Sequence, residues 1–270
     1  MISLTEVQKQ YVLKNRIGTV TINDKEYFFK PDDVEYNVLG LEQVMELFAK
    51  KVNIKCPHYD IVEIDDLFFT FSENISNYFF VASKYNIPGF STLYEIWDKL
   101  EESKLPRVDI LMFEIVKIYL FDIFSVNGDR NHNNWGIVNK DDNFPEVYIL
   151  DNEFSFDREY SVLLSSEVEF PISKHGGIEE FNPNSNEDSV LRFNHEDLTY
   201  FLKTASSEFI DLLVDMYNTL TPELLEDVIE EVKEINQLPL THLYYIKDLY
   251  RKNYNAIGEL IGRYVKNSRS

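Results

Sequence analysis

Acidic and amide side chains lie at short spacing in one segment of the chain, residues 124–157, which reads FSVNGDRNHNNWGIVNKDDNFPEVYILDNEFSFD. Asp129 and Asn134 are five positions apart, and Asp151 follows the stretch VYIL, which predicts a short β-strand. A carboxylate can orient or deprotonate a hydroxyl group, and amide and carboxylate oxygens are the ligands that magnesium prefers. These residue types in this order indicate a site for phosphoryl transfer, with one catalytic aspartate and two metal ligands.

A phosphate site also needs a cation, and Lys30 lies at the end of a predicted strand. Residues 17–30, IGTVTINDKEYFFK, alternate apolar and polar residues around the turn signal NDK, which predicts a β-hairpin. The next segment, LGLEQVMELFAKKVNI, has apolar residues at helical spacing and carries Glu42 and Glu46. A strand lysine held by a helix glutamate can neutralise nucleotide phosphates. Either glutamate, one helical turn from the other, is a candidate partner of Lys30.

The predicted elements around these residues fall into two groups. Residues 1–90 hold the hairpin, one helix and two strands in HYDIVEIDDLFFTFSEN, a small β-rich lobe. Residues 91–270 are mainly helical, with a central helix in RVDILMFEIVKIYLFDIFSVN that is apolar nearly all round and therefore buried. Residues 170–195 are rich in Gly, Pro, Asn and Ser and are predicted to form a loop. The sequence predicts an α+β fold with two lobes, and the polar segment begins where the central helix ends.

Composition limits the location and the partners of this chain of 270 residues. The formal net charge is −21, which disfavours binding to nucleic acid and anionic lipid and favours basic or neutral partners, although solubility alone would also explain it. Cys56 is the only cysteine, so no intrachain disulfide forms, as is typical of a reducing compartment. No signal peptide or membrane span is predicted, so we expect a cytoplasmic protein; export by a specialised route stays open.

The motifs resemble a known family. NGDRNHNNWGI followed by YILDNEFSF is similar to the catalytic segment of the atypical kinases that include the HipA-like and CtkA-like protein kinases and the type II phosphatidylinositol 4-kinases, and YFFKPDD is similar to the FKP segment around their ATP lysine. The resemblance implies a two-lobed protein-kinase-like fold and phosphoryl transfer that depends on ATP and Mg²⁺. It implies that Asp129 is the catalytic residue, that Asn134 and Asp151 bind Mg²⁺, and that Lys30 contacts the phosphates with Glu42 as its favoured partner.

The resemblance leaves three functions open. A serine/threonine protein kinase is the first; it would act on a protein substrate, which the charge suggests is basic, or on itself. A lipid kinase is the second, but the lone Cys56 and the acidic charge count against membrane attachment. A binding module that has lost transfer is the third, because Gly18 is the only glycine before Lys30 and a glycine-rich loop is missing. The chain also differs from the DNG motif of the type II lipid kinases, because its third position is Glu153.

Other residues of the polar segment have structural explanations. Asp129 and Asn134 could form a turn held by side-chain hydrogen bonds, although the ordered set around them favours a site. His132 is expected to hold the loop, because no second histidine lies at a useful spacing for a metal. Trp135 is expected to anchor the loop in the helical lobe. Arg130 could bind a phosphorylated residue or pair with a carboxylate, and the second is commoner.

Overall fold

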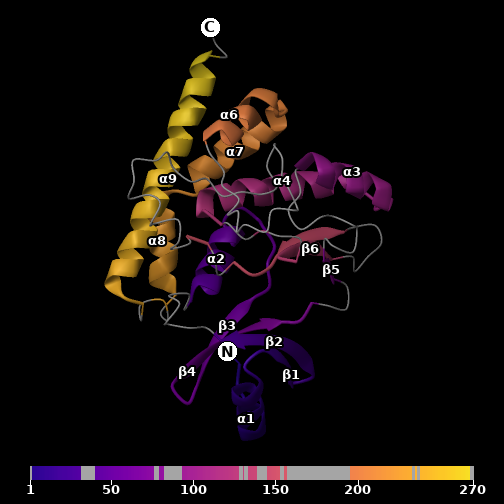
Figure 1. The fold of residues 1–270 in the computed structure, drawn as a ribbon, viewed down its shortest axis with the longest axis vertical. Helices are drawn as coiled ribbons and strands as arrows, with labels where there is room; N and C mark the ends of the chain where they lie inside the picture. The colour runs from indigo at the N-terminus through magenta and orange to yellow at the C-terminus, as the bar shows by residue number, and fades with distance from the viewer. Residues whose placement is uncertain are drawn as a thin grey trace, which may run out of the picture.

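The computed structural model describes most of the chain: residues 2–31, 40–75, 79–81, 93–127, 130, 133–138, 145–152, 155–156, 195–232, 235 and 238–267 (Figure 1). Asp129, His132 and Glu153 lie outside the described residues, as does the loop predicted at 170–195 up to its last residue. The predicted boundary between the lobes near residue 90 also lies outside them.

Two tight hairpins build the first sheet. Its strands are β1 (Gly18–Ile22), β2 (Lys25–Pro31), β3 (Tyr59–Ile64) and β4 (Leu67–Glu73), all antiparallel in the order β1-β2-β4-β3. Both two-residue turns, at 23–24 and 65–66, have positive φ at each position, a conformation that Asn and Asp adopt more readily than other side-chain-bearing residues. The sequence predicted both hairpins from these turn residues.

Alternation along the strands gives this sheet two different faces. Phe29, Phe69 and Phe71 are fully buried on one face, in a small core that also contains Val12. The intervening residues point to the opposite face, so Lys30 is directed away from that core and toward the rest of the molecule.

A helix that the sequence analysis did not predict lies beside this small core. The predicted lobe contains one helix, whereas the described residues of the same stretch form two: α1 (Glu6–Asn15) and α2 (Leu41–Lys50). Val12 is the only buried residue of α1, so the helix has no broad apolar stripe for a periodicity search to find. Its start does carry a local signal, a capping box in which Thr5 and Gln8 bond each other's backbone amides. Figure 1 shows α1 below the sheet and α2 above it.

The second sheet lies beside the central helix. It contains β5 (Phe79–Val81), β6 (Trp135–Val138) and β7 (Glu146–Ile149), antiparallel in that order. The predicted central helix is α4 (Val108–Ser125), which follows α3 (Leu93–Ser103) and is buried over most of its length. The sequence predicted β7 but neither β5 nor β6. All four residues of β6 are buried, so this strand lacks the alternation of buried and exposed positions that β7 shows.

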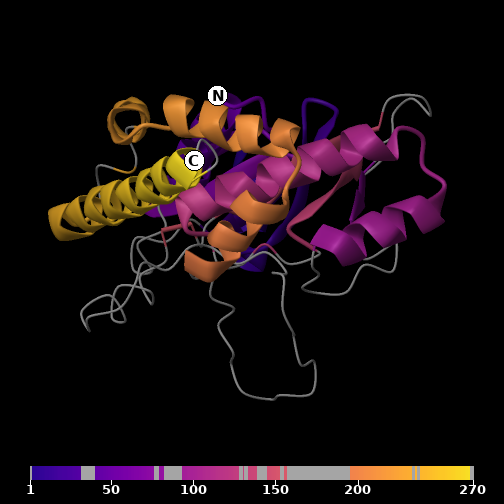
Figure 2. The same cartoon turned by 90° about the horizontal axis from the view of Figure 1, so that it is seen from above.

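Four C-terminal helices complete the large core: α6 (His195–Thr204), α7 (Ser207–Thr219), α8 (Pro222–Glu231) and α9 (Leu240–Asn267). Thr221 caps α8, its hydroxyl accepting a hydrogen bond from the Leu224 amide at 3.2 Å, with Pro222 as the first helical residue. Figure 2 shows the long α9 beside α4. Over the described ranges, no helix combines the length and the apolar character needed to cross a membrane. The architecture is α+β, with a β-sheet first and a mainly helical remainder.

Candidate active site

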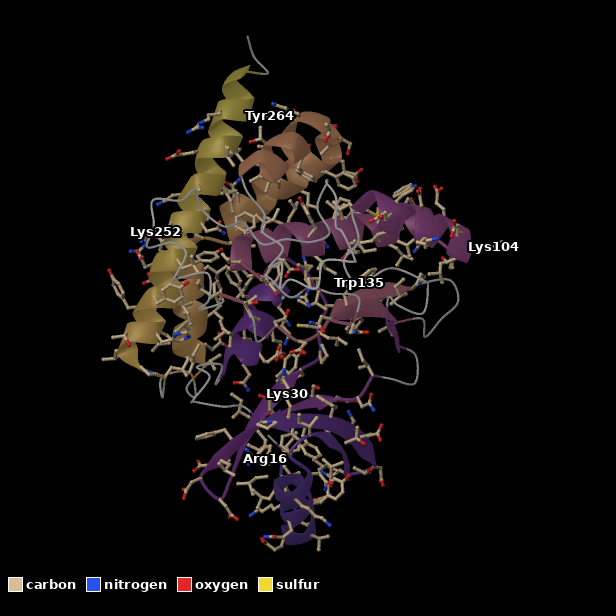
Figure 3. The ribbon with its side chains drawn as sticks, in the orientation of Figure 1. Arg16, Lys30, Lys104, Trp135, Lys252 and Tyr264 are labelled. Atoms are coloured by element: carbon tan, nitrogen blue, oxygen red, sulfur yellow. The ribbon has the colours of Figure 1, made fainter. Side chains whose placement is uncertain are left out.

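Lys30, Glu42 and Asp151 meet although they are far apart in the sequence. The Lys30 ammonium lies 3.0 Å from Glu42 Oε1 and 2.6 Å from Asp151 Oδ1. The Lys30 side chain is 17% exposed and that of Glu42 is 3% exposed, whereas Asp151 is 39% exposed and faces solvent on one side. In Figure 3, Lys30 lies where the first sheet meets the rest of the molecule. One cation is therefore shared by a buried and a partly exposed carboxylate.

Backbone bonds bring Asp151 to the lysine. Lys55, just before β3, forms a parallel bridge with Tyr148 in β7, and the Ile149 amide donates to the Lys55 carbonyl at 2.9 Å. The Leu150 amide donates to the Asn134 carbonyl at 2.8 Å, which joins the end of β7 to the start of β6. Asp151 then has a φ of 49°, a left-handed conformation that ends the extended strand.

Of the two candidate glutamates, Glu42 is the one that contacts Lys30. Glu46, one turn on, is also buried but contacts other groups. Its carboxylate bonds Lys50 and the His58 imidazole, the latter at 2.8 Å, and accepts the Tyr59 amide at 2.9 Å. Glu46 therefore ties α2 to the start of β3, which holds the helix in the register that leaves Glu42 facing Lys30.

The pKa of Glu42 depends on its burial and on the groups around it. Burial raises the pKa of the Glu42 carboxyl above its ordinary value, and the nearby Asp151 carboxylate raises it further. Lys30 and the Asn152 amide oppose this effect, because each stabilises the charged form. The Asn152 amide donates to Glu42 Oε2 at 3.0 Å, so both carboxylate oxygens of Glu42 are bonded.

Arg130 is the centre of a buried network next to this ion pair. Its Nε donates to Asp122 Oδ2 at 3.0 Å and its Nη2 to Asp122 Oδ1 at 3.2 Å. Its Nη1 donates to the carbonyl oxygens of Asn134 and Leu150, and Nη2 also donates to Asn152 Oδ1. The Arg130 and Asp122 side chains are 1% and 0% exposed. Arg130 was expected either to bind a phosphorylated residue or to pair with a carboxylate, and in the structure it pairs with the Asp122 carboxylate.

The end of α4 has an unusual backbone conformation before the polar segment. Val126 has a φ of 52°, which is rare for a β-branched residue. Asn253 in α9 holds this end of the helix, because its amide donates to the carbonyls of Ile123 and Phe124 at 2.7 and 3.0 Å. The Phe156 amide donates to the Ser125 carbonyl at 3.0 Å. These contacts fix where the chain leaves α4.

A pocket of about 290 Å³ opens between the first sheet and residues 133–134 and 150–151. It contains the polar residues Lys30, Glu42, Asn133, Asn134 and Asp151, and its other lining residues come mainly from the sheet: Thr19, Phe28, Pro57, Tyr59, Thr70, Ser72, Glu73, Asn74, Ile75 and Leu150. Phe28 is 40% exposed. Because side chains alternate between the two faces of a strand, Phe28 lies on the same face as Lys30, two residues further on. The pocket thus has the aromatic ring of Phe28 on one wall and the charged groups of Lys30, Glu42 and Asp151 at one end.

The donor set in this pocket fits a magnesium ion. Asn134 and Asp151 both line it and offer an amide and a carboxylate oxygen, the hard ligands that Mg²⁺ takes beside water and phosphate. In the part of the chain that the structure describes, no three His, Cys, Asp or Glu side chains cluster as a metal site.

The structure brings together Lys30, Glu42, Asn134 and Asp151 of the predicted site, while Asp129 lies outside the described residues. Two participants were not singled out from the sequence, Asp122 and Asn152. Asp122 had a signal, since an acidic residue within an apolar helix needs a buried partner. Asn152 is the second residue of the DNG-like motif, but the resemblance assigned a role only to its neighbour Asp151. Trp135 is buried in the large core, as expected.

Comparison with known proteins adds a fold to this geometry. No protein-family model and no curated protein matches the sequence. Among solved structures, the chain is similar to the proinflammatory kinase CtkA of Helicobacter pylori, with a TM-score of 0.68 and 13% identity over 93% of this chain and 95% of that one. It is also similar to HipA from the toxin–antitoxin complex of Shewanella oneidensis MR-1, with a TM-score of 0.61 and 12% identity over 97% and 74%. The chain therefore has the kinase-like fold that its motifs predicted.

Proposed function

We propose that this protein is a phosphotransferase that uses ATP and Mg²⁺ and modifies serine or threonine hydroxyls of a protein. The observation that supports it best is the Lys30 ammonium held between Glu42 and Asp151 in a pocket that Asn134 also lines. A lysine, a buried glutamate and two oxygen ligands beside one pocket are the parts that phosphoryl transfer requires. The kinase-like fold is consistent with this proposal.

Each residue of the site has one role in the proposal. Lys30 would bind the nucleotide phosphates, and Glu42 would hold its ammonium in place. Asn134 and Asp151 would hold Mg²⁺, which neutralises phosphate charge when it is bound. Because Asp151 contacts Lys30 directly, its carboxylate would have to share its negative charge between the lysine and the ion. Asp129, by the family resemblance, would orient or deprotonate the acceptor hydroxyl.

The remaining pocket surface suggests how the nucleotide is oriented. The exposed ring of Phe28 offers a flat apolar surface for the base, while Lys30, two residues further on the same strand, marks the phosphate end. The only glycine in β1 is Gly18, and a glycine-rich phosphate loop is not encoded before Lys30. The proposal therefore assigns phosphate binding to side chains rather than to a loop of backbone amides.

The test is transfer of labelled phosphate from ATP to the protein itself and to a basic protein, with and without Mg²⁺. We expect transfer by the wild type that depends on Mg²⁺, and loss of more than about a hundredfold in Asp129→Ala and Asp151→Asn. Equal label in the wild type and in Asp129→Ala would reject the assignment. The acidic charge of −21 is the reason to choose a basic acceptor.

A nucleotide-binding module without transfer is the second candidate. The lack of a glycine-rich segment before Lys30 favours it, because close approach of backbone amides to phosphates needs small residues. Thermal unfolding distinguishes the two proposals. A rise in the melting temperature with ATP and Mg²⁺, without any labelled product on protein or lipid acceptors, would favour the module.

A further inference from the structure

Asn152 contacts both halves of the site and is completely buried. Its Oδ1 accepts a hydrogen bond from Arg130 Nη2. Its backbone amide and its Nδ2 both donate to Glu42 Oε2, at 3.0 and 3.5 Å. A continuous chain of bonds therefore runs from Asp122 in α4 through Arg130 and Asn152 to Glu42 in α2, and from there to Lys30.

Only an amide side chain of this size satisfies both neighbours. Arginine has donors and no acceptor, so the group facing Arg130 has to be an oxygen. The charged Glu42 carboxylate has acceptors and no donor, so the group facing it has to carry hydrogen. Aspartate would suit Arg130 but would oppose Glu42, and leucine would have the right shape with neither function.

We propose that Asn152 is a positioning residue that holds Glu42 against Lys30 by joining it to the buried Arg130. The part of this inference that concerns nucleotide binding rests on the phosphotransferase proposed above. Asn152 itself does not contact the nucleotide; it acts through Glu42. The arrangement also joins α2 to the segment after β7, because α2 cannot move away without breaking the Glu42–Asn152 contact.

The charges around Glu42 explain why this link is needed. Lys30 is attracted by two carboxylates, Glu42 and Asp151, and the second is more exposed. Without a fixed Glu42, the lysine would lose its contact with the buried carboxylate and keep its contact with Asp151, the residue proposed to hold the metal. Asn152 therefore favours the state in which Lys30 is already oriented by Glu42.

The first experiment tests the contact without any nucleotide. Asn152→Asp keeps the oxygen that faces Arg130 and puts a second oxygen against Glu42, so its melting temperature should fall by several degrees. Adding Glu42→Gln replaces one of the two facing carboxylates by a neutral amide, which removes the charge repulsion that Asn152→Asp creates. The melting temperature of the double variant Glu42→Gln/Asn152→Asp should therefore fall by less than the two single decreases added together. Additive changes would overturn the proposed contact.

The second experiment tests whether Asn152 acts through Glu42. The dissociation constant of ATP with Mg²⁺ is measured by calorimetry for the wild type, Asn152→Leu, Glu42→Gln and the double variant. Each single change should weaken binding about tenfold, and the double variant should bind no more weakly than Glu42→Gln alone. If the two single increases in the dissociation constant multiply in the double variant, Asn152 does not act through Glu42 and the positioning role is overturned.

A matched control separates this role from general loss of stability. Tyr250→Phe keeps a buried ring and removes the hydrogen bond that the Tyr250 hydroxyl donates to the Leu220 carbonyl at 2.7 Å, between α9 and the end of α7. It should lower the melting temperature and leave ATP affinity within about twofold of the wild type. A similar loss of affinity in Tyr250→Phe and Asn152→Leu would contradict the inference.

The two proposals can fail separately. One outcome is that the wild type binds no ATP, while the melting temperature of the Glu42→Gln/Asn152→Asp variant still falls by less than the two single decreases added together. In that case the Asn152–Glu42 contact stands and the phosphotransferase is rejected. If the wild type binds ATP and transfers labelled phosphate, and Asn152→Leu binds ATP equally well, the phosphotransferase stands and the positioning role is rejected.

Discussion

The buried pair between Asp122 and Arg130 gives a prediction whose size follows from the structure. Two hydrogen bonds of 3.0 and 3.2 Å join side chains that are 0% and 1% exposed. Asp122→Asn keeps the shape and one acceptor, but it removes the negative charge and places an amide donor against an arginine donor. The guanidinium then stays buried without its counter-charge.

The free energy of unfolding that Asp122→Asn should lose can be estimated from two known costs. Losing one hydrogen bond to a charged group costs about 1.5 to 3 kcal/mol, and breaking a buried ion pair costs about 3 to 5 kcal/mol. The carbonyls of Asn134 and Leu150 still accept from Arg130, so the cost should be near the lower of these ranges. We expect a loss of about 3 kcal/mol in the free energy of unfolding, which corresponds to about 6 to 10 °C in melting temperature.

Urea unfolding followed by far-ultraviolet circular dichroism measures this loss, with calorimetry for the melting temperature. The control is Glu226→Gln, which breaks the exposed pair with Arg251 at 2.7 Å and should cost no more than about 1 kcal/mol. A loss below about 1 kcal/mol in Asp122→Asn as well would refute the reasoning, because the carbonyls alone would then be sufficient partners for Arg130.

Three further predictions concern the pocket, the end of α4 and the single thiol. Phe28→Ala should raise the dissociation constant of ATP by about tenfold, the usual effect of losing one base-stacking ring, and unchanged affinity in calorimetry would exclude stacking. Asn253→Ala should lower the free energy of unfolding by about 1 to 3 kcal/mol, measured in urea, because two helix-end carbonyls lose their donor. Burial raises the pKa of Cys56 to about 12, so at pH 8 iodoacetamide should alkylate it roughly a thousandfold more slowly in the folded than in the unfolded protein, by mass spectrometry.

Local signals predicted the elements that carry the site. The turn pairs Asn23–Asp24 and Asp65–Asp66 marked both hairpins because these residue types tolerate positive φ. Thr221 and Pro222 marked the start of α8 through capping. Such signals act within a few residues, so they can be read without the fold. The capping box at Thr5 is of the same kind, and it could have revealed α1.

The partners of buried charges could not be predicted in the same way. Glu42 and Glu46 lie on one face of α2 and are both buried, so spacing alone cannot choose between them. The choice depends on how α2 docks against β3, where Glu46 accepts the Tyr59 amide. Asn152 likewise joins Glu42 to Arg130 across 110 and 22 positions of sequence.

Short-range sequence signals are sufficient to predict the residue types at the site, their order along the chain and the hairpins and helices that carry them, because each depends on neighbouring residues. The sharing of Lys30 by Glu42 and Asp151 and the pairing of Arg130 with Asp122 depend instead on how distant elements pack together. These contacts join separate elements in a region from which water is excluded, where a charge has to find a partner at whatever sequence distance packing allows.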